Sequence, residues 1–383
     1  MTMTDTRYNL LMLSGDSSIA RGIDGAFYQM LGRFSQYWGR IDILTPSAPD
    51  AMPQIIHDNV HVHPANQHRA LQPLFIQRTG NALLSERPYH LLVSHDFGFF
   101  YNGIGAYALL RQHDLPLVSE IHHIEGYPIA ITRREKLWRY AAQKYIPFIA
   151  KQSAQFRVVN QDVASQLRAL GVAADVIHVL HSLYLDLEQY RPQTTEKQVD
   201  VLFVGRLASN KGIMLLLEAI RMAKQTHPNI SLAIRGDGEL KQQIISFIEQ
   251  HQLQANVQFL PRVSDSSQMP TLYRQARMLV CASTVEGNPR VTIESMACGT
   301  PVISTRVGIM PDVIEQGQNG LLVDWDSEQI ASAILQLLDD TVQYQAIAQA
   351  GQQSVQKFDA DITIRDYALA YHAIIEQYSL KSE

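Results

Sequence analysis

The sequence is poor in cysteine and in long apolar runs, and each shortage excludes a class of protein. The two cysteines among 383 residues, Cys281 and Cys298, lie in apolar surroundings. They predict buried free thiols in a reducing compartment and exclude a disulfide framework or a cysteine-based zinc site. No window holds about eighteen consecutive apolar residues, so we expect no membrane-spanning helix. The first residues have no basic segment and too short an apolar run for a signal peptide, so we expect a cytoplasmic protein.

The charged residues are few and nearly balanced in sign. They make up 18% of the chain, and the net charge is −5, which argues against a general nucleic-acid binder. Apolar residues make up 46%, enough to fill complete cores. The length predicts two domains, and a run with one proline and two threonines, 186–197, reads as the linker between them.

The most informative stretch follows a short apolar strand near 278–282. The strand leads into a loop with Gly287 and Pro289, and a helix begins near Arg290. Such a strand–loop–helix unit presents free backbone N–H groups, which favour an anion such as a phosphate. The glycine lets the backbone approach a ligand closely, and the proline suits a helix start. We therefore expect an anion-binding site here.

Two acids flank this helix start with seven residues between them. Glu286 lies in the loop, and Glu294 lies a turn into the helix, on the side that can face the loop. One acid could reach one end of a ligand and the other its opposite end, with a phosphate held between them. The alternative is a helix with two solvated acids near its N-terminus, where acids are favoured in any case.

A second strand end carries two cations. The strand that begins at Val199 ends in Gly205 and Arg206, and Lys211 follows just before a helix at 213–224. Arginine offers a planar fork and lysine a point charge, and both suit a diphosphate. The alternative is an ordinary solvated loop.

The amino-terminal half also begins as a parallel α/β domain, with strands at 8–13 and 41–44 around a helix at 26–37. A later strand, 115–121, ends in His122 and His123. Ligands of open parallel sheets sit beyond the carboxyl ends of the strands, and a histidine there can donate to developing negative charge or to a sugar hydroxyl. The alternative is an exposed loop histidine.

Two other patterns resemble binding motifs but have simpler explanations. Histidines and apolar residues alternate over 57–63, which fits an exposed strand face better than a metal site. Residues 102–108 resemble a dinucleotide-binding run, but an eight-residue loop separates Gly103 from the preceding strand, which ends at Ser94. We interpret them as part of a helix near 104–112.

The stretch 131–151 is basic, with six cations and one acid, a local charge of +5. Leu137, Ala141, Tyr145 and Phe148 recur at helical spacing, and Pro147 is expected to interrupt or bend the helix. One interpretation is a helix at an anionic membrane surface, and the other is a helix that covers the sheet with its basic face in solvent.

Together these motifs resemble the retaining GT-B glycosyltransferases of glycosyltransferase family 4, the glycosyl transferases group 1. The resemblance is dense from 205 to 323 and sparse before. It implies an α/β fold in which two Rossmann-like parallel-sheet domains face a cleft. The expected parts are an acceptor domain at 1–185, a linker at 186–197, a nucleotide-sugar donor domain at 198–360, and a helix at 361–383 that packs back on the first domain.

The resemblance also implies roles for individual residues. Glu286 would contact hydroxyls of the donor sugar and Glu294 the ribose, while Arg206 and Lys211 would bind the diphosphate. His122, with His123 as second choice, would face the donor sugar. The remaining donor-binding positions are Gly22 (or Gly25), Gly205, Gly236, Arg262, Val263, Gly287, Asn288, Pro289, Arg290 and Val291.

The implied reaction transfers a hexose-type sugar from a nucleotide diphosphate sugar to an acceptor hydroxyl with retention of configuration. The acceptor would be a sugar, a glycan or a lipid-linked molecule, in polysaccharide or glycoconjugate synthesis. No cofactor or metal is expected, and the leaving phosphate would take the acceptor proton. The family's Pro-Asn-Gly is replaced here by residues that begin His181-Ser182, which leaves the hinge contacts open. The alternatives are a nucleotide-sugar epimerase and a non-catalytic nucleotide-sugar-binding protein.

Overall fold

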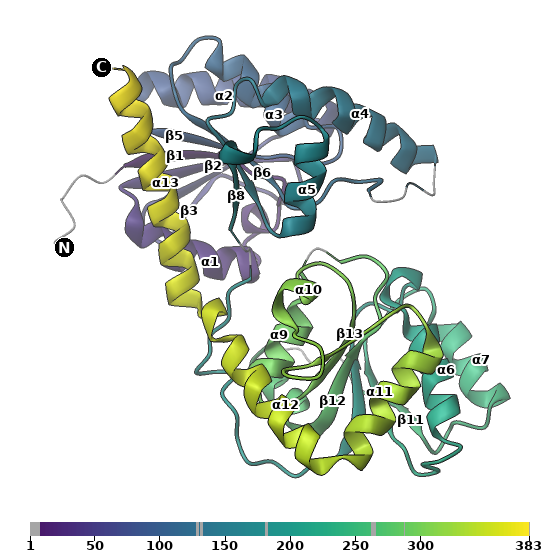
Figure 1. Ribbon diagram of the computed structural model, residues 1–383. Coiled ribbons are helices and arrows are strands. Elements are labelled where there is room, and N and C mark those ends of the chain that lie inside the picture. The colour runs from purple at the N-terminus through teal and green to yellow at the C-terminus, as the bar shows by residue number, and fades with distance from the viewer. Residues whose placement is uncertain are drawn as a thin grey trace. The chain divides into compact units, whose positions relative to one another are not determined.

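The computed structural model describes residues 8–127, 130, 133–180, 183–261, 266–286 and 288–382. Unit 1 comprises Met1–His181 and Asp361–Glu383, and unit 2 comprises Ser182–Ala360. Each unit holds one sheet, parallel throughout or nearly so, with helices on both faces, which confirms the predicted α/β class (Figure 1). Helix α13 (Ala360–Ser382) belongs to unit 1 although most of that unit precedes unit 2 in the chain.

The sheet of unit 1 has eight strands in the order β3-β4-β2-β1-β5-β6-β7-β8. All neighbours are parallel except the edge strand β3, which is antiparallel to β4. The strands are β1 (Asn9–Leu13), β2 (Arg40–Thr45), β3 (Gln54–Ile56), β4 (Val60–Pro64), β5 (Leu91–His95), β6 (Leu117–Ile121), β7 (Gln155–Val158) and β8 (Ile177–Val179). The alternating pattern at 57–63 therefore falls mainly on β4, where Val60 and Val62 are buried.

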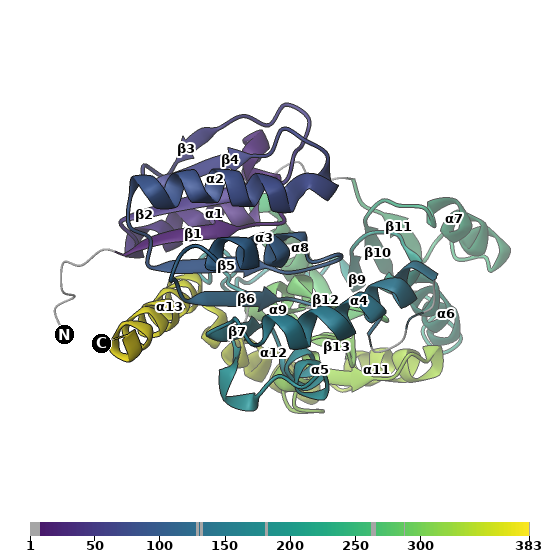
Figure 2. The same ribbon diagram turned by 90° about the horizontal axis from the view of Figure 1, so that it is seen from above.

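Helices cover both faces of this sheet. One face packs α2, α3, α4 and α5 into a shared apolar core, and Figures 1 and 2 show the first three together on that side. On the other face, Phe34 of α1 stacks on Tyr367 of α13 with 4.7 Å between ring centroids. The helices besides α13 are α1 (Ala26–Phe34), α2 (Gln72–Glu86), α3 (Tyr101–Leu110), α4 (Arg133–Ile149) and α5 (Gln161–Ala169).

The sheet of unit 2 is wholly parallel, with the order β11-β10-β9-β12-β13-β14. The strands are β9 (Val199–Val204), β10 (Leu232–Arg235), β11 (Val257–Phe259), β12 (Ala276–Cys281), β13 (Val302–Thr305) and β14 (Leu321–Val323). The helices are α6 (Ile213–Ala223), α7 (Lys241–Gln250), α8 (Met269–Gln275), α9 (Arg290–Ala297), α10 (Met310–Val313), α11 (Ser327–Asp339) and α12 (Thr341–Ser354). The crossover at the centre of the sheet puts the ends of β9 and β12 side by side, where an open parallel sheet binds ligands.

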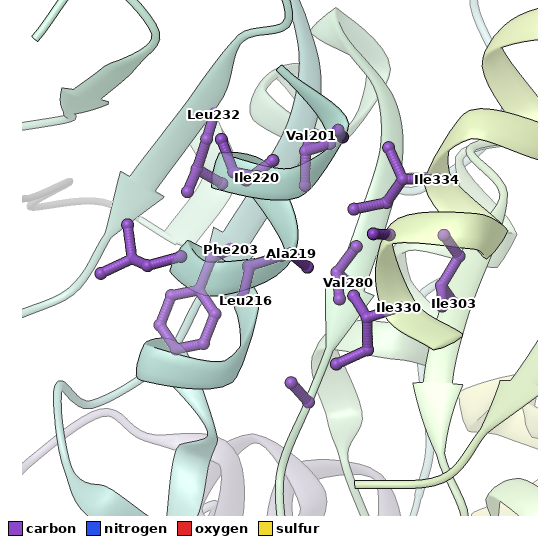
Figure 3. Packing of buried hydrophobic residues seen from close by; sticks show 14 of the residues in the cluster. Val201, Phe203, Leu216, Ala219, Ile220, Leu232, Val280, Ile303, Ile330 and Ile334 are labelled. Carbon is purple, nitrogen blue, oxygen red and sulfur yellow. The ribbon is translucent and has the colours of Figure 1, made fainter. Parts of the chain in front are cut away.

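Branched apolar side chains fill the core of unit 2. Figure 3 shows Val201 and Phe203 of β9 against Leu216 and Ile220 of α6, and the same cluster continues to Ile330 of α11. The opposite face packs α8, α9 and α10. Both cysteines are buried free thiols, as predicted. The two buried faces hold the strand ends in fixed positions.

The basic helix α4 differs from its predicted form. Leu137 is 53% exposed and Phe148 is 41% exposed, whereas Ile146 and Ile149 are buried. The predicted apolar stripe was wrong at its two ends because the buried face is shifted around the helix toward its C-terminal half. The helix also continues past Pro147 to Ile149. Among the described residues, no helix is long and apolar enough to cross a membrane.

A buried carboxylic acid lies under the loop that follows β5. Asp96 is 1% exposed, and its two oxygens accept hydrogen bonds from the hydroxyls of Ser94 at 2.5 Å and Tyr145 at 2.7 Å. A Cβ on Gly103 would lie 1.5 Å from the Tyr145 hydroxyl, so only glycine leaves room for this bond. Burial raises the pKa of Asp96 to about 7, despite these hydrogen bonds.

The raised pKa of Asp96 predicts that the fold loses stability as the pH rises from about 4 to about 7. The folded state holds the Asp96 proton more tightly than the unfolded state, so this contribution to stability is complete below about pH 4 and is lost as the pH rises through about 7. Over that window the free energy of unfolding should fall by about 1.4 kcal/mol per pH unit. Asp96→Asn should remove this slope in urea unfolding, whereas Asp366→Asn, at an exposed site, should retain it. A wild-type slope in the Asp96 variant would contradict the assignment.

Candidate active site

A pocket of about 260 Å³ lies in unit 2 at the carboxyl ends of β9 and β12. Several predicted positions meet there, although they are up to 86 residues apart in the chain. Its walls are Phe203, Val204, Gly205, Arg206, Lys211, Val280, Cys281, Ser283, Glu286, Asn288, Pro289, Arg290 and Val291. Helix α9 begins at the edge of this pocket, so its N-terminal backbone also contributes partial positive charge.

A charged pair lies in the pocket wall. The Lys211 ammonium donates to Glu286 Oε1, and the Ser283 hydroxyl donates to the same oxygen at 2.9 Å. Both charged side chains are mostly buried, at 18% and 17% exposure. A buried acid with two donors holds one rotamer, so Glu286 presents its other oxygen in a defined direction.

Glycine at 212 is required for the turn that places Lys211. Its φ is 66°, in the left-handed region, and a Cβ there would lie 1.8 Å from the carbonyl oxygen of Ala282. The backbone N–H of Thr284 also donates to the Asn210 carbonyl at 2.9 Å. These contacts fasten the loop after β9 to the loop after β12. The cation and the acid are therefore held by two strands at once.

Arg206 differs from Lys211 in its surroundings. It follows Gly205 at the end of β9, lines the pocket and is exposed. Within the described part of the chain it forms no ion pair, so its guanidinium can turn toward an anion. Gly236 has a packing role instead, because a Cβ there would lie 1.9 Å from the Gly205 carbonyl oxygen. It is not part of the pocket wall.

The second acid of the pair, Glu294, is buried behind the pocket. It is 6% exposed, and its carboxylate accepts bonds from the Tyr190 hydroxyl at 3.1 Å, the Tyr273 hydroxyl at 2.6 Å and Arg290 Nε at 2.8 Å. Arg290 lines the pocket, whereas Glu294 does not. The carboxylate therefore orients Arg290 from behind, and its predicted contact with a ribose stays a prediction.

Three predicted donor-binding residues, Arg262, Val263 and Gly287, lie outside the described residues. The neighbours Asn288, Pro289 and Val291 line the pocket as expected. Gly22 caps a short turn in unit 1 with φ 68°, and Gly25 caps the start of α1. Among the described residues, no group of three or more His, Cys, Asp or Glu side chains is arranged to hold a metal ion.

The two candidate histidines of unit 1 lie in different surroundings. His122 follows β6, and its Nδ1 lies 3.2 Å from Nε2 of His95 at the end of β5. Burial lowers the pKa of His122 well below its usual value and that of His95 as well, so both rings are neutral at pH 7. His122 Nε2 is buried without a partner in the described chain. His123 is exposed and lies 4.0 Å from Glu125.

Sequence reasoning missed the supporting residues of the site. Ser283 lies three positions before Glu286, and nothing in the loop sequence predicts that its hydroxyl donates to the Glu286 carboxylate. Trp325, 49% exposed after β14, donates from Nε1 to the Ser283 carbonyl at 2.7 Å. Tyr190 and Tyr273 reach Glu294 from 104 and 21 residues away. No local pattern marks such distant contacts, whereas a tryptophan directly after an apolar strand is a sequence signal that could have been used.

Two protein families match the chain. The family described as "Glycosyl transferases group 1" matches residues 187–354, and the family described as "Glycosyl transferase 4-like domain" matches residues 38–182. The two matches cover most of unit 2 and most of unit 1, respectively. The first contains every residue of the unit 2 pocket.

Individual proteins are similar at lower identity. The chain is 26% identical over 401 residues to D-inositol 3-phosphate glycosyltransferase 1 of Catenulispora acidiphila. The aligned region covers 93% of this chain and 92% of that protein. It is 25% identical over 256 residues to a glycogen synthase of Mycobacterium tuberculosis, spanning 65% of this chain and 60% of that enzyme. The fold resembles that of sucrose-phosphate synthase from Thermosynechococcus elongatus, with a TM-score of 0.79, 20% identity, and coverage of 97% and 100%.

Proposed function

We propose that this chain, which belongs to the glycosyl transferases group 1 with the GT-B fold, transfers a sugar from a nucleotide diphosphate sugar to an acceptor hydroxyl with retention of configuration. The observation that carries the proposal is the unit 2 pocket, where Arg206, Lys211 and Glu286 meet at the start of α9. Cations and a helix N-terminus suit a diphosphate, and a fixed carboxylate suits sugar hydroxyls. The acceptor would be a sugar, a glycan or a lipid-linked molecule in polysaccharide or glycoconjugate synthesis.

The chemistry follows from the charge that develops on the leaving group. As the bond between the sugar and the diphosphate breaks, negative charge grows on the diphosphate, and Arg206 and Lys211 stabilise it. Glu286 accepts from donor-sugar hydroxyls through the oxygen that Lys211 and Ser283 leave free. The leaving phosphate takes the acceptor proton, so no side-chain base is needed in the pocket.

His122 contributes as a neutral ring in this proposal. With a lowered pKa it carries no charge at pH 7, so it cannot act as a cation toward the donor. Its unpartnered Nε2 can form one hydrogen bond to a sugar hydroxyl. His122→Ala should accordingly lower the transfer rate and leave nucleotide affinity nearly unchanged.

The proposal is tested with a panel of nucleotide sugars. Thermal shift identifies the stabilising donor, because a ligand that binds only the folded state raises Tm. Incubation of that labelled donor with candidate acceptors, followed by NMR of the product anomer, then tests transfer and retention. An epimerised donor formed without acceptor would favour the epimerase instead. Binding without any turnover would favour a non-catalytic sensor.

Transfer is expected to survive chelation of divalent metal ions. In the proposed mechanism, two side-chain cations and the start of α9 balance the charge of the diphosphate, which is the usual task of a metal ion. The measurement is the transfer rate in EDTA, compared with the rate after Mg²⁺ or Mn²⁺ is returned. Loss of activity in EDTA with recovery on adding the ion would show that a metal takes part.

Helix α4 is proposed to contact an anionic membrane surface, on the inner face of the cytoplasmic membrane. Its exposed residues combine the cations Arg133, Arg134 and Lys136 with the apolar side chains of Leu137 and Tyr140. An interfacial helix has this combination of charge and apolar area. The protein should therefore sediment with vesicles that contain anionic lipid, and less so as salt rises, since charges are screened within about 10 Å at 0.1 M.

A charge-matched comparison makes the membrane test specific. Changing Arg133, Arg134, Lys136 and Arg139 to glutamine should release the protein from the vesicles. The same number of changes away from α4, at Lys224, Lys241, Lys357 and Arg365, should leave binding unaltered. If the wild-type protein stays in the supernatant at low salt, α4 does not bind the membrane and is an ordinary surface helix.

A further inference from the structure

Two side chains hold the loop of Glu286 from outside the unit 2 pocket. The carbonyl oxygen of Ser283 accepts one hydrogen bond from the Thr305 hydroxyl at 2.5 Å and another from Trp325 Nε1 at 2.7 Å. A carbonyl oxygen has two acceptor lone pairs, so both are used and the direction of this peptide plane is fixed. Neither Thr305 nor Trp325 lines the pocket itself.

These hydrogen bonds extend across the sheet of unit 2. Thr305 is the last residue of β13, and Trp325 lies two residues past the end of β14. The strand order β9-β12-β13-β14 places both beyond the two strands that carry the pocket. The loop after β12 is therefore hydrogen-bonded to its neighbours on both sides, since the Thr284 N–H donates to the Asn210 carbonyl in the loop after β9.

The backbone around Trp325 is held in place, although the side chain is 49% exposed. On one side, the Asp324 N–H donates to Gln329 Oε1 at 3.0 Å. On the other side, Asp326 caps α11, and its side chain accepts from the Glu328 N–H at 3.2 Å. A donor on a fixed backbone keeps its direction, so Nε1 stays aimed at the loop after β12.

Ser283 connects this support to the carboxylate in the pocket. Its hydroxyl donates to Glu286 Oε1 at 2.9 Å and accepts a weak hydrogen bond from the Cys281 thiol, whose sulfur lies 3.7 Å away. Burial raises the pKa of Cys281, so the thiol keeps its proton and remains a donor. The Ser283 hydroxyl therefore accepts on one side and directs its own proton at Glu286.

We propose that Trp325 and Thr305 are positioning residues for the reaction. By fixing the Ser283 carbonyl they fix the hydroxyl of the same residue, which holds Glu286 toward the donor sugar. The inference rests on the proposed function for the role of Glu286. It divides the donor site into two parts, because the cations of the pocket serve the diphosphate, whereas the hydrogen bonds to Ser283 serve the sugar.

The first test removes one hydrogen bond at a time and measures kcat for hydrolysis of a nucleotide sugar without acceptor. UDP-glucose, GDP-mannose and ADP-glucose are assayed, and the one that wild type hydrolyses fastest is used throughout. Trp325→Phe keeps an aromatic ring and Thr305→Val keeps the shape, and each should lower kcat by about threefold to tenfold. Thr305→Ser keeps the hydroxyl and should retain the wild-type rate. Trp138→Phe is the matched control, because Trp138 Nε1 has no partner in the described part of the chain.

Nucleotide affinity separates positioning from general damage to the pocket. In calorimetry with the matching nucleoside diphosphate, Trp325→Phe and Thr305→Val should give Kd values within about twofold of wild type, because Ser283 does not touch the cations' ligand in the proposed site. A loss of diphosphate affinity as large as the loss of kcat would show that the two residues support the whole pocket, and would overturn the inference. Unchanged kcat in both variants would overturn it as well.

A double-mutant cycle tests the route through Glu286. In the background of Glu286→Ala, neither Trp325→Phe nor Thr305→Val should lower kcat further, because the carboxylate that they position is absent. A further loss as large as that in the wild-type background would mean that both residues act on another part of the site, and the inference would be wrong.

The indole N–H resonance of Trp325 gives a readout that needs no turnover. The chain has three tryptophans, and this resonance is assigned by its absence in Trp325→Phe. In wild type it should shift with one of the three nucleotide sugars and stay in place with the matching nucleoside diphosphate. Equal shifts with both, or no shift with any of them, would overturn the inference while turnover still supported the proposed function. A sugar-dependent shift without hydrolysis or transfer would remove the proposed function and leave the link between Trp325 and the sugar intact.

Discussion

Lys211→Ala is expected to weaken the binding of a nucleoside diphosphate by about 10- to 100-fold, because a hydrogen bond to a charged group is worth about 1.5–3 kcal/mol. The side chain is mostly buried in the pocket wall, so little solvent competes for it. Calorimetry with UDP, GDP and ADP measures the effect. Lys241→Ala is the control, since Lys241 is half exposed and 3.7 Å from Asp237 on the other side of the turn. Equal affinities of the Lys211 variant and wild type would rule out the diphosphate assignment.

Lys211→Ala should reduce kcat by a larger factor than it reduces the affinity for the nucleoside diphosphate. Charge on the diphosphate is greatest in the transition state, and removal of one stabilising donor typically costs about 100- to 1000-fold in kcat. Because Lys211 also holds Glu286, the double variant with Glu286→Gln separates the two tasks. If Lys211 acted only through Glu286, the double variant would be no slower than Glu286→Gln alone. A further loss is expected.

The sequence alone could predict the framework of this site, because the framework depends on local patterns. Apolar strands, glycine turns and helix caps lie within a few residues of one another, as at the start of α5, where the Asn160 side chain accepts a 2.9 Å bond from the Val163 N–H. The positions of Arg206, Lys211 and Glu286 at neighbouring strand ends also follow from a parallel sheet. That geometry brings them to one pocket.

What the sequence could not predict depends on contacts between distant residues. The glycines of the run 102–108 look like a nucleotide loop, but Gly103 leaves room for Tyr145, and a Cβ on Gly105 would lie 2.7 Å from Ile76 of α2. The burial of Glu294 likewise depends on two tyrosines that come from outside its helix. On α4, Leu137 is exposed although it lies at the helical spacing of the predicted apolar stripe. None of these long-range contacts produces a periodic pattern in the sequence.

A buried charge network in unit 1 supports the second large prediction. Glu120 of β6 and Arg157 of β7 are opposite each other in the sheet, 2.8 Å apart and about 5% exposed. The Glu120 Oε1 also accepts from the hydroxyls of Tyr371, at 2.5 Å, and Tyr367, both from α13. The Arg157 guanidinium lies over the Tyr367 ring at 4.2 Å. The network therefore fastens the last helix to the sheet.

Arg157→Met is expected to lower the free energy of unfolding of unit 1 by about 3–5 kcal/mol, because it leaves a buried carboxylate without its cation. The double change Glu120→Leu with Arg157→Met should regain much of that loss, since replacing both members of a buried ion pair by apolar groups is often close to neutral. Arg365→Met is the matched control on the exposed side of α13, and it should change stability by less than about 0.5 kcal/mol. Urea unfolding measures all three.

The pH dependence of this loss identifies its cause. Burial alone would raise the pKa of Glu120, but Arg157 and the Tyr367 hydroxyl lower it to about 2. A carboxyl with a lowered pKa adds stability above its ordinary pKa of about 4.5, and that stability is lost as the pH falls toward about 2. Without Arg157, burial should raise the pKa of Glu120, so the acid can become neutral in mild acid at no cost to the fold. The difference between wild type and Arg157→Met should therefore shrink between about pH 7 and pH 4. A difference that stayed constant over that range would mean that lost packing of the arginine over Tyr367, and not an unpaired charge, accounts for the destabilisation.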